Sequence, residues 1–458
     1  MKMKPHYYQM EAYNFALQRL YVQDQAGAGL FLDPGLGKTL ITLMLLECLR
    51  DMGEIESVLV VAPLRVCRLV WEQEIEKAGF DFTTNILCQR VKPALKNKGA
   101  FIELINPESL HHLIGECGRW DTLVIDESTK FKNSTCKRMR ALKKMLPNFN
   151  KRVILTGTPA PNSLADLHSQ VFILDGGEAL GRNITVFRSL YMQQGGWQGR
   201  QWKLKDNQEA KIHEQVAPLC LRLDAETCLD MPDKVVHDVE CQMPPACVPK
   251  YKQLQRDLLA QLETKDILAM NQASAYMKMR QFANGQMYDA EREVHFVHKE
   301  KLDALEEVVD ELNGKPVLVF YQFGHDSCAI LKKYPKAPVL NGKTKPAAAN
   351  KMLADWNAGK THVFLVQNQA ASHGLNMQGA GNDVVYYGLG DSLEVYEQSY
   401  RRIYRQGVKG SEVRIHRLLM LGTVDMIVRD RLELKDQTQQ QFLTCLKNHA
   451  REGLTCPS

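Results

Sequence analysis

The chain has 458 residues, of which 45% are apolar and 24% are charged. This is the balance of an ordinary globular protein with two or three domains, and it excludes a disordered or collagen-like chain. Lysine and arginine number 58 against 53 acidic residues, a net charge of +5 that permits a nucleic-acid partner without requiring one. The N-terminus lacks an apolar signal segment, and no apolar stretch approaches the ~20 residues that span a bilayer. We therefore expect a cytoplasmic protein with no membrane partner.

Two stretches of the chain alternate short apolar segments with longer helical patterns, as parallel sheets covered by helices require. The strands expected in the first stretch are Leu30–Leu32, Val58–Ala62, Phe101–Ile105, Thr122–Ile125 and Arg152–Leu155. Those expected in the second are Val317–Tyr321, Val339–Leu340, His362–Val366, Val384–Tyr387 and Val413–Leu418. The predicted fold is α/β, with two tandem lobes and helical inserts.

The helical patterns and prolines between these stretches suggest where the lobes divide. We place an N-terminal lobe at residues 1–233, with a helical insert at about 163–230. The C-terminal lobe covers 234–458, with a helical segment at about 246–300 and its sheet at about 301–458.

The segment Asp33–Thr39 reads Asp-Pro-Gly-Leu-Gly-Lys-Thr and lies between an expected strand and an expected helix. Strand, glycine loop and helix in this order cradle phosphate. Lys38 would reach the β- and γ-phosphates, and Thr39 would ligate Mg²⁺. Leu32 stands where the usual pattern has its first glycine, so a chance glycine-rich turn remains the alternative for this segment alone. The other expected nucleotide contacts of the loop are Gly35, Leu36 and Gly37.

An acidic motif follows the expected strand Thr122–Ile125. Asp126 and Glu127 come directly after it, at the carboxyl end where parallel sheets hold their ligands. Asp126 would hold the Mg²⁺, and Glu127 would orient and deprotonate the attacking water. An acidic helix cap is the alternative for this segment alone. With the phosphate loop expected on a neighbouring strand, the two motifs together predict a lobe that binds and hydrolyses a nucleoside triphosphate.

A third segment is the strand that runs into Thr156-Gly157-Thr158-Pro159. With the two motifs above, this turn closely resembles motif III of superfamily II helicases, in the Swi/Snf-like subgroup of ATP-driven DNA translocases. Asp126–Asn133 is similar to the extended motif II of that subgroup, with Ser128-Thr129 in place of the usual Ala-His. Val60–Leu64 resembles motif Ia, and Ile105–Leu110 resembles motif Ib. The resemblance implies two tandem RecA-like P-loop lobes, ATP and Mg²⁺ as cofactors, and a coupling role for Thr156, Gly157 and Thr158.

The resemblance continues through the second half of the chain. Pro316–Phe323 resembles motif IV, Ala370–Ala380 motif V, and Glu397–Gly407 motif VI. The resemblance implies functions for five residues of these motifs. They are Gly374 and Asn376 for coupling, Gln398 for nucleotide binding, and Arg402 and Arg405 for catalysis. The two arginines are three apart on a predicted helix, so we expect them on one face, where they would stabilise the charge that develops on the γ-phosphate.

The N-terminal segment His6–Glu11 resembles the glutamine motif that precedes the phosphate loop in superfamily II. The side-chain amide of Gln9 can donate to and accept from an adenine edge at once, so the resemblance implies that Gln9 reads the base. A plain amphipathic first helix is the alternative.

Between Lys130 and Arg152 the chain has nine lysines or arginines and no acidic residue. Such a run could track a phosphate backbone, or it could be the solvated face of a helix. Because the run directly follows the acidic motif, we expect it to contact DNA. Our candidates are Lys130, Lys132, Arg138 and Lys143. The resemblance implies duplex DNA, gripped by its backbone without reading of its sequence.

These observations predict an ATP-dependent DNA translocase or helicase in a bacterial or phage-infected cell, with DNA-stimulated ATP hydrolysis. An RNA helicase and a catalytically silent, ATP-gated DNA-binding clamp are the alternatives. The Asp-Glu-Ser-Thr sequence argues against the RNA helicase, and the intact Lys38, Glu127 and paired arginines argue against the clamp. The compact chain is similar to phage and bacterial members of the subgroup, so we expect a minimal two-lobe motor.

Overall fold

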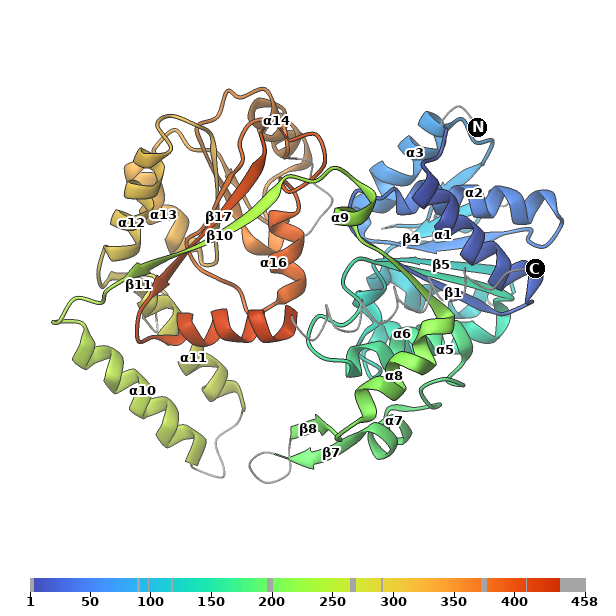
Figure 1. The fold of residues 1–458 in the computed structure, drawn as a ribbon, viewed down its shortest axis with the longest axis horizontal. Helices are drawn as coiled ribbons and strands as arrows, with labels where there is room; N and C mark the ends of the chain where they lie inside the picture. Colours follow the sequence, from blue (N-terminus) through green and yellow to red (C-terminus); the bar gives the residue numbers. More distant parts are fainter. Residues whose placement is uncertain are drawn as a thin grey trace. The chain divides into compact units, whose positions relative to one another are not determined.

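The computed structural model describes residues 4–88, 91–97, 99–116, 118–195, 201–263, 269–289, 291–371, 377–408 and 410–436. The described residues up to Asp230, with Lys435 and Asp436, form one compact unit, and Met231–Leu434 form a second. We call them unit 1 and unit 2 and describe each by itself (Figure 1). Within the described ranges, none of the helices combines the length and apolar character needed to cross a membrane.

Unit 1 is built on a seven-stranded parallel sheet with the strand order β3-β4-β2-β5-β6-β1-β9. The predicted strands of the first stretch are all present, and the edge strands β3 and β9 are additional. Most of these strands are buried along their whole length, as parallel strands covered on both faces require. The bounds are β1 Gly27–Leu32, β2 Val58–Val61, β3 Thr84–Ile86, β4 Ile102–Ile105, β5 Thr122–Asp126, β6 Lys151–Thr156 and β9 Cys220–Leu223.

Helices cover both faces of this sheet (Figure 1). One face carries α1 (Tyr7–Leu17), α2 (Lys38–Asp51) and α3 (Trp71–Ala78), and the other carries α5 (Lys137–Met145) and α6 (Ala165–Asp175).

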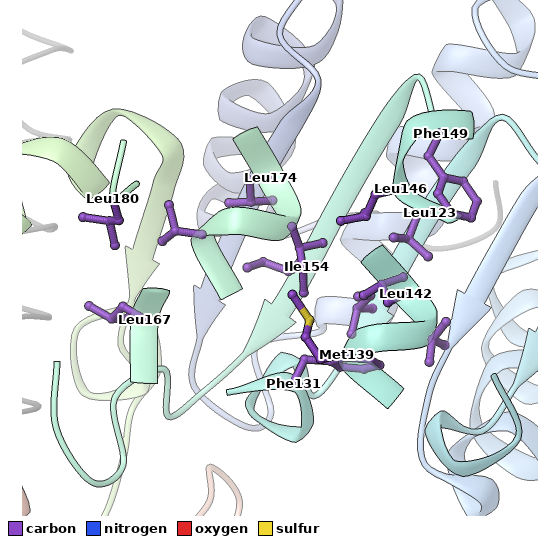
Figure 2. Packing of buried hydrophobic residues seen from close by; sticks show 14 of the residues in the cluster. Leu123, Phe131, Met139, Leu142, Leu146, Phe149, Ile154, Leu167, Leu174 and Leu180 are labelled. Atoms are coloured by element: carbon purple, nitrogen blue, oxygen red, sulfur yellow. The ribbon is translucent and has the colours of Figure 1, made fainter. Parts of the chain in front are cut away.

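The α5 and α6 side of the sheet forms a continuous apolar core. Figure 2 shows Leu142 of α5 and Leu167 and Leu174 of α6 packing toward Leu123 and Ile154 of the sheet. These five side chains are fully buried, so the inner faces of both helices are fixed by apolar contact.

The segment that we expected as a helical insert at 163–230 also contains strands. After α6 come α7 (Ile184–Tyr191), an antiparallel hairpin of β7 (Met192–Gly195) and β8 (Gln201–Leu204), and α8 (Gln208–Val216). The chain then returns to the sheet as β9, which pairs with β1.

Unit 2 contains a six-stranded parallel sheet with the order β10-β17-β16-β13-β15-β14. The predicted strands of the second stretch are again present, and β10 is additional. β10 lies at the edge and is largely exposed, so it lacks the apolar run that marks a buried strand. The bounds are β10 Asp233–Cys241, β13 Val317–Tyr321, β14 Val339–Leu340, β15 Val363–Gln367, β16 Asp383–Tyr386 and β17 Glu412–Met420. The two tandem parallel sheets confirm the predicted α/β fold class.

The helices of unit 2 include α10 (Val248–Glu263), α11 (Ala269–Ala283), α12 (Glu300–Glu311), α13 (Gly324–Lys333), α14 (Pro346–Asn357) and α16 (Leu393–Tyr400). A buried polar cluster joins Lys301 of α12 and Asp326 of α13 to Asn284 and Asp425. The ammonium of Lys301 is fully buried, 2.6 Å from the carboxylate of Asp425, and it donates to the Oδ1 of Asn284 at 2.8 Å. The Nδ2 of Asn284 in turn donates to Asp326 at 3.1 Å. A buried ammonium is tolerated because its charge is compensated in this way.

We predict that His298, beside this cluster, makes stability depend on pH. Burial lowers the pKa of its imidazole from 6.5 to about 4, and the Lys301 ammonium contributes to this shift. The folded chain holds His298 neutral, whereas the unfolded chain takes up a proton below its higher pKa. Its contribution to stability is therefore complete above pH 6.5 and is lost as the pH falls toward 4, by up to ~3 kcal/mol.

Urea unfolding at a series of pH values between about 7 and 4.5 would measure this effect. The variant His298→Phe should show a shallower loss of stability than the unsubstituted chain. Equal slopes in the two proteins would contradict the assignment.

Candidate nucleotide site

The phosphate loop connects the end of β1 to the start of α2. Gly37 precedes the first residue of α2 with φ 78°, and Gly35 has φ 97°, both in the left-handed region that favours glycine. A Cβ on Gly37 would collide with the Nε2 of Gln9. The loop therefore needs glycine at this position for its dihedral angle and for its packing.

Gln9 lies directly on the phosphate loop. Its Nε2 donates to the carbonyl oxygen of Leu36 at 3.2 Å, and its Oε1 accepts from the backbone N–H of His6 at 3.0 Å. The side chain is 5% exposed. The structure thus brings together the predicted nucleotide residues Gln9, Leu36 and Gly37, while base reading by Gln9 stays a prediction.

Three carboxylates act electrostatically on Lys38. Its Nζ donates to the carbonyl oxygen of Leu32 at 2.9 Å, so the residue that replaces the usual first glycine supplies a backbone acceptor. Burial lowers the pKa of Lys38, and the charges of Glu127, Asp126 and Asp33 oppose that shift. The predicted phosphate-binding cation and both predicted acidic residues therefore belong to one electrostatic site.

Asp126 closes β5 and is 8% exposed. Burial raises the pKa of its carboxyl, whereas the Lys38 ammonium and the Trp71 side chain act to lower it. Glu127, the next residue, has φ 62° and ψ 62°, a left-handed conformation that is uncommon for a residue with a Cβ. The strand end and this strained residue fix where the two carboxylates stand.

We had expected the phosphate loop and the acidic motif on neighbouring strands, but the two strands are not adjacent. β6 lies between β1 and β5, because it pairs with both. This inserts the Thr156–Thr158 turn, which follows β6, between the two motifs. A Cβ on Gly157 would lie 3.2 Å from the carbonyl oxygen of Leu32 and from Pro34, so the turn packs tightly on the phosphate loop.

The threonines of this turn are buried. The hydroxyl of Thr156 accepts from the backbone N–H of Thr158 at 3.1 Å, which closes the turn. The Oγ1 of Thr158 is buried and finds no hydrogen-bond partner among the described residues. Buried hydroxyls usually have partners, so this one is a free polar group within the candidate site.

The sequence analysis did not predict one buried ion pair at the site. Arg222 of β9 contacts the carboxylate of Asp33 at 2.7 Å, with the side chains only 3% and 5% exposed. Arg222 also donates to the carbonyl oxygen of Phe31, and Asp33 accepts from the backbone N–H of Ala225. The pair fastens the first residue of the phosphate loop to the edge strand. Its sequence signal is a cation inside the apolar segment Cys-Leu-Arg-Leu.

The motif VI residues belong to unit 2. Gln398 is buried within α16, but this helix ends at Tyr400. Arg402 and Arg405 therefore follow the helix in a series of turns, and the expectation that they share a helical face is wrong. The backbone N–H of Arg402 bonds three residues back, to Ser399, and the Nε of Arg405 donates to the carbonyl oxygen of Arg401 at 2.9 Å. Gly374 and Asn376 of motif V lie outside the described residues.

The basic run divides into buried and exposed side chains. Lys151 donates to the carbonyl oxygen of Leu20 and to Asp24, and Arg152 donates to the carbonyl oxygens of Leu146 and Ile173, so both serve the fold.

The predicted DNA candidates of the run are half-buried. Lys143 lies over the ring of Phe172 at 4.5 Å, and Arg138 is 3.8 Å from Glu108. Burial raises the pKa of the Asp166 carboxyl, and the charge of Lys132 opposes that shift. The exposed cations of α5 are Lys137, Arg140 and Lys144.

The donor set suits Mg²⁺. Asp126 offers a buried carboxylate at a strand end, and Thr39 offers a hydroxyl in the first turn of α2. Thr39 directly follows Lys38, whose pKa is influenced by the charge of Asp126. Both are hard oxygen ligands, and Mg²⁺ is commonly held by one or two protein oxygens together with substrate phosphates. Among the described residues, no group of three or more His, Cys, Asp or Glu forms a separate metal centre.

The fold and the site define a helicase-like P-loop ATPase core. The SNF2-related domain matches residues 8–293, and the helicase conserved C-terminal domain matches residues 300–407. The chain belongs to the SNF2 family. Membership implies ATP hydrolysis and the use of a nucleotide, typically with Mg²⁺.

Relatives of known name extend this comparison. Protein p41 of Acyrthosiphon pisum secondary endosymbiont phage 1 is 33% identical, over 90% of this chain and 93% of its own length. The transcription regulatory protein SNF2 of Saccharomyces cerevisiae is 24% identical over 87% of this chain, which spans 25% of that protein. The YwqA protein of Bacillus subtilis is 24% identical over 91% of this chain, which spans 46% of it.

Among solved structures, the SWI2/SNF2 ATPase core of Sulfolobus solfataricus in complex with dsDNA is similar. It is 22% identical, with a TM-score of 0.44, and the match covers 98% of this chain and 95% of that chain.

We predict that the Arg222–Asp33 pair stabilises unit 1. Arg222→Met removes the cation and leaves the buried Asp33 carboxylate behind, which should cost ~3–5 kcal/mol in the free energy of unfolding. The double variant Arg222→Met/Asp33→Asn should lose less, because the buried charge is then absent. Urea denaturation would measure both.

Arg152→Met is the matched control, because Arg152 is a partly buried arginine of the same sheet that donates to backbone carbonyls. It should cost less than Arg222→Met. A double variant less stable than Arg222→Met alone would show that the pair does not act as proposed.

Proposed function

We propose that this chain is a DNA-stimulated ATPase that converts ATP hydrolysis into movement along duplex DNA. One observation carries the proposal: Lys38 sits on the phosphate loop within the electrostatic reach of both Asp126 and Glu127. A phosphate-binding cation, a Mg²⁺-type carboxylate and a second carboxylate are the parts that phosphoanhydride hydrolysis needs in one place.

Each group has a distinct role in this proposal. Lys38 exchanges the Leu32 carbonyl for a phosphate oxygen when ATP binds. Thr39 and Asp126 would hold Mg²⁺, which would supply positive charge to neutralise the phosphates. Glu127 orients the attacking water and accepts its proton.

The proposal also gives the arginines of motif VI a role in hydrolysis. Phosphate-binding lobes leave the charge that develops on the γ-phosphate incompletely compensated, and arginines supplied from elsewhere accelerate hydrolysis by ~10³-fold or more. Arg402 and Arg405 of unit 2 are our candidates. Because their charge is needed mainly in the transition state, Arg405→Ala should lower turnover more than it lowers nucleotide affinity.

The exposed face of α5 is the proposed DNA contact of unit 1. Lys137, Arg140 and Lys144 recur at a spacing of three and four residues, so they share one helical face, whereas Met139 and Leu142 point into the core (Figure 2). Such cations contact phosphates without reading bases. Binding should therefore be insensitive to sequence and strongly dependent on salt.

The first test is ATP turnover measured in parallel with no nucleic acid, single-stranded DNA, duplex DNA and RNA. We expect the largest stimulation by duplex DNA. Glu127→Gln should still bind ATP but hydrolyse it at least ~10²-fold more slowly, whereas Lys38→Ala should lose nucleotide affinity.

The alternatives make different predictions in the same assay. Stimulation by RNA alone would identify an RNA helicase, and ATP binding without turnover in the unsubstituted chain would identify a silent clamp. Movement along DNA should displace the third strand of a triplex while a blunt duplex stays intact. Unwinding of long blunt duplexes without triplex displacement would contradict a pure translocase.

The second test concerns the α5 face. The triple variant Lys137→Gln/Arg140→Gln/Lys144→Gln should bind duplex DNA more weakly, and its plot of log affinity against log salt should be shallower by up to ~3. The control Lys77→Gln/Lys92→Gln/Lys211→Gln removes the same charge from exposed positions of unit 1 outside α5. Equal salt slopes in the two triple variants would exclude a specific contact by α5.

A further inference from the structure

A glutamine lies in the middle of the apolar face of α6. Gln170 is fully buried, and its neighbours on that face, Leu167 and Leu174, pack against the sheet (Figure 2). Glutamine is mostly found exposed, and a buried amide is costly unless its hydrogen bonds are made. A side chain in this position therefore calls for a specific reason.

The side chain of Gln170 joins two motifs of the candidate site. Its Oε1 accepts from the hydroxyl of Ser128 at 2.7 Å, and its Nε2 donates to the carbonyl oxygen of Pro159 at 2.6 Å. The same Nε2 donates to the carbonyl oxygen of Asp166 at 2.9 Å, one turn back in α6. Both amide protons are thus used. Ser128 directly follows Glu127, and Pro159 directly follows the Thr156–Thr158 turn, so one amide connects the acidic motif to the turn.

Glu127 needs such an anchor. Its left-handed conformation costs on the order of 1–3 kcal/mol and persists only where the surrounding structure determines it. Ser128 begins the short 3₁₀ turn Ser128–Phe131, in which the N–H of Lys130 bonds to the carbonyl oxygen of Glu127 at 3.0 Å. The bond from Ser128 to Gln170 fixes the start of this turn, and with it the direction of the Glu127 side chain.

We propose that Gln170 is a positioning residue for ATP hydrolysis: it holds the base, Glu127, in register with the Thr156–Thr158 turn. The inference rests on the proposed role of Glu127. Gln170 acts through Ser128 and has no assigned contact with the nucleotide. Its loss should therefore lower kcat, with little effect on the binding of ATP.

The test compares three single variants and one double variant in the full chain. Gln170→Met keeps the length of the side chain and removes its hydrogen bonds, and Ser128→Ala removes the partner hydroxyl. The control is His168→Phe, on the same helix: His168 is also buried, and its ring nitrogen bonds to the carbonyl oxygen of Gly181. That bond serves the loop after α6 and touches neither motif.

Gln170→Met should lower kcat for DNA-stimulated hydrolysis at least ~10-fold, with KM for ATP within about threefold of the unsubstituted value. Ser128→Ala should act in the same direction, and the double variant should be no worse than the more impaired single, because both remove one interaction. His168→Phe should keep kcat within about twofold of the unsubstituted value, even if it lowers the free energy of unfolding as much as Gln170→Met does.

An unchanged kcat in Gln170→Met, or an equal loss of kcat in His168→Phe at matched stability, would overturn the proposal. Hydrogen exchange at the amide of Lys130 tests the same bridge without ATP: it should be faster in Gln170→Met and unchanged in His168→Phe. If the unsubstituted chain hydrolysed no ATP, the proposed function would fail by itself. The exchange measurement would still test whether Gln170 fixes the turn after Glu127, since unchanged protection of Lys130 in Gln170→Met would refute that role.

Discussion

The carboxyl edge of the unit 1 sheet depends on the compensation of charge around Lys38. Burial disfavours the Lys38 ammonium and the Asp126 carboxylate alike, as their opposite pKa shifts show, and each favours the charged form of the other. Removing either charge would leave the other poorly solvated. The electrostatic interaction between the start of α2 and the end of β5 is therefore favourable without a ligand. A nucleotide adds its own negative charge to this balance, which favours the charged form of Lys38.

The position of β6 explains how this edge is built. Since β6 separates β1 from β5, the turn that follows it stands between the phosphate loop and the acidic motif. Gly157 lets the turn approach the loop on one side, and Gln170 joins it to Ser128 on the other. A shift at any one of the three motifs must therefore disturb the other two, because close packing leaves little room for independent movement.

Apolar periodicity was enough to predict the ten buried strands and thus the class of the fold. It failed for β3, which is short and half-buried, for β9, where Arg222 interrupts the apolar run, and for β10, which is mostly exposed. The phosphate loop and the acidic motif were visible because their chemistry is local in sequence. Arg222 and Gln170 were not, because their partners are 189 and 42 residues away and meet them only in the folded sheet. The end of α16 at Tyr400 was missed because no glycine or proline marks it.

The phosphate loop is anchored from two directions. Gln9 holds Leu36 from the N-terminal helix, and Arg222 holds Asp33 from β9. The second anchor continues directly along the chain: Asp33 also accepts from Ala225, and Met231, six residues further on, already belongs to unit 2. The segment that leaves unit 1 is therefore tied to the first residue of the loop through two hydrogen-bonded contacts with one buried carboxylate. The Asp33 carboxylate is thus a shared anchor for the phosphate loop and for the start of the segment that leads to unit 2.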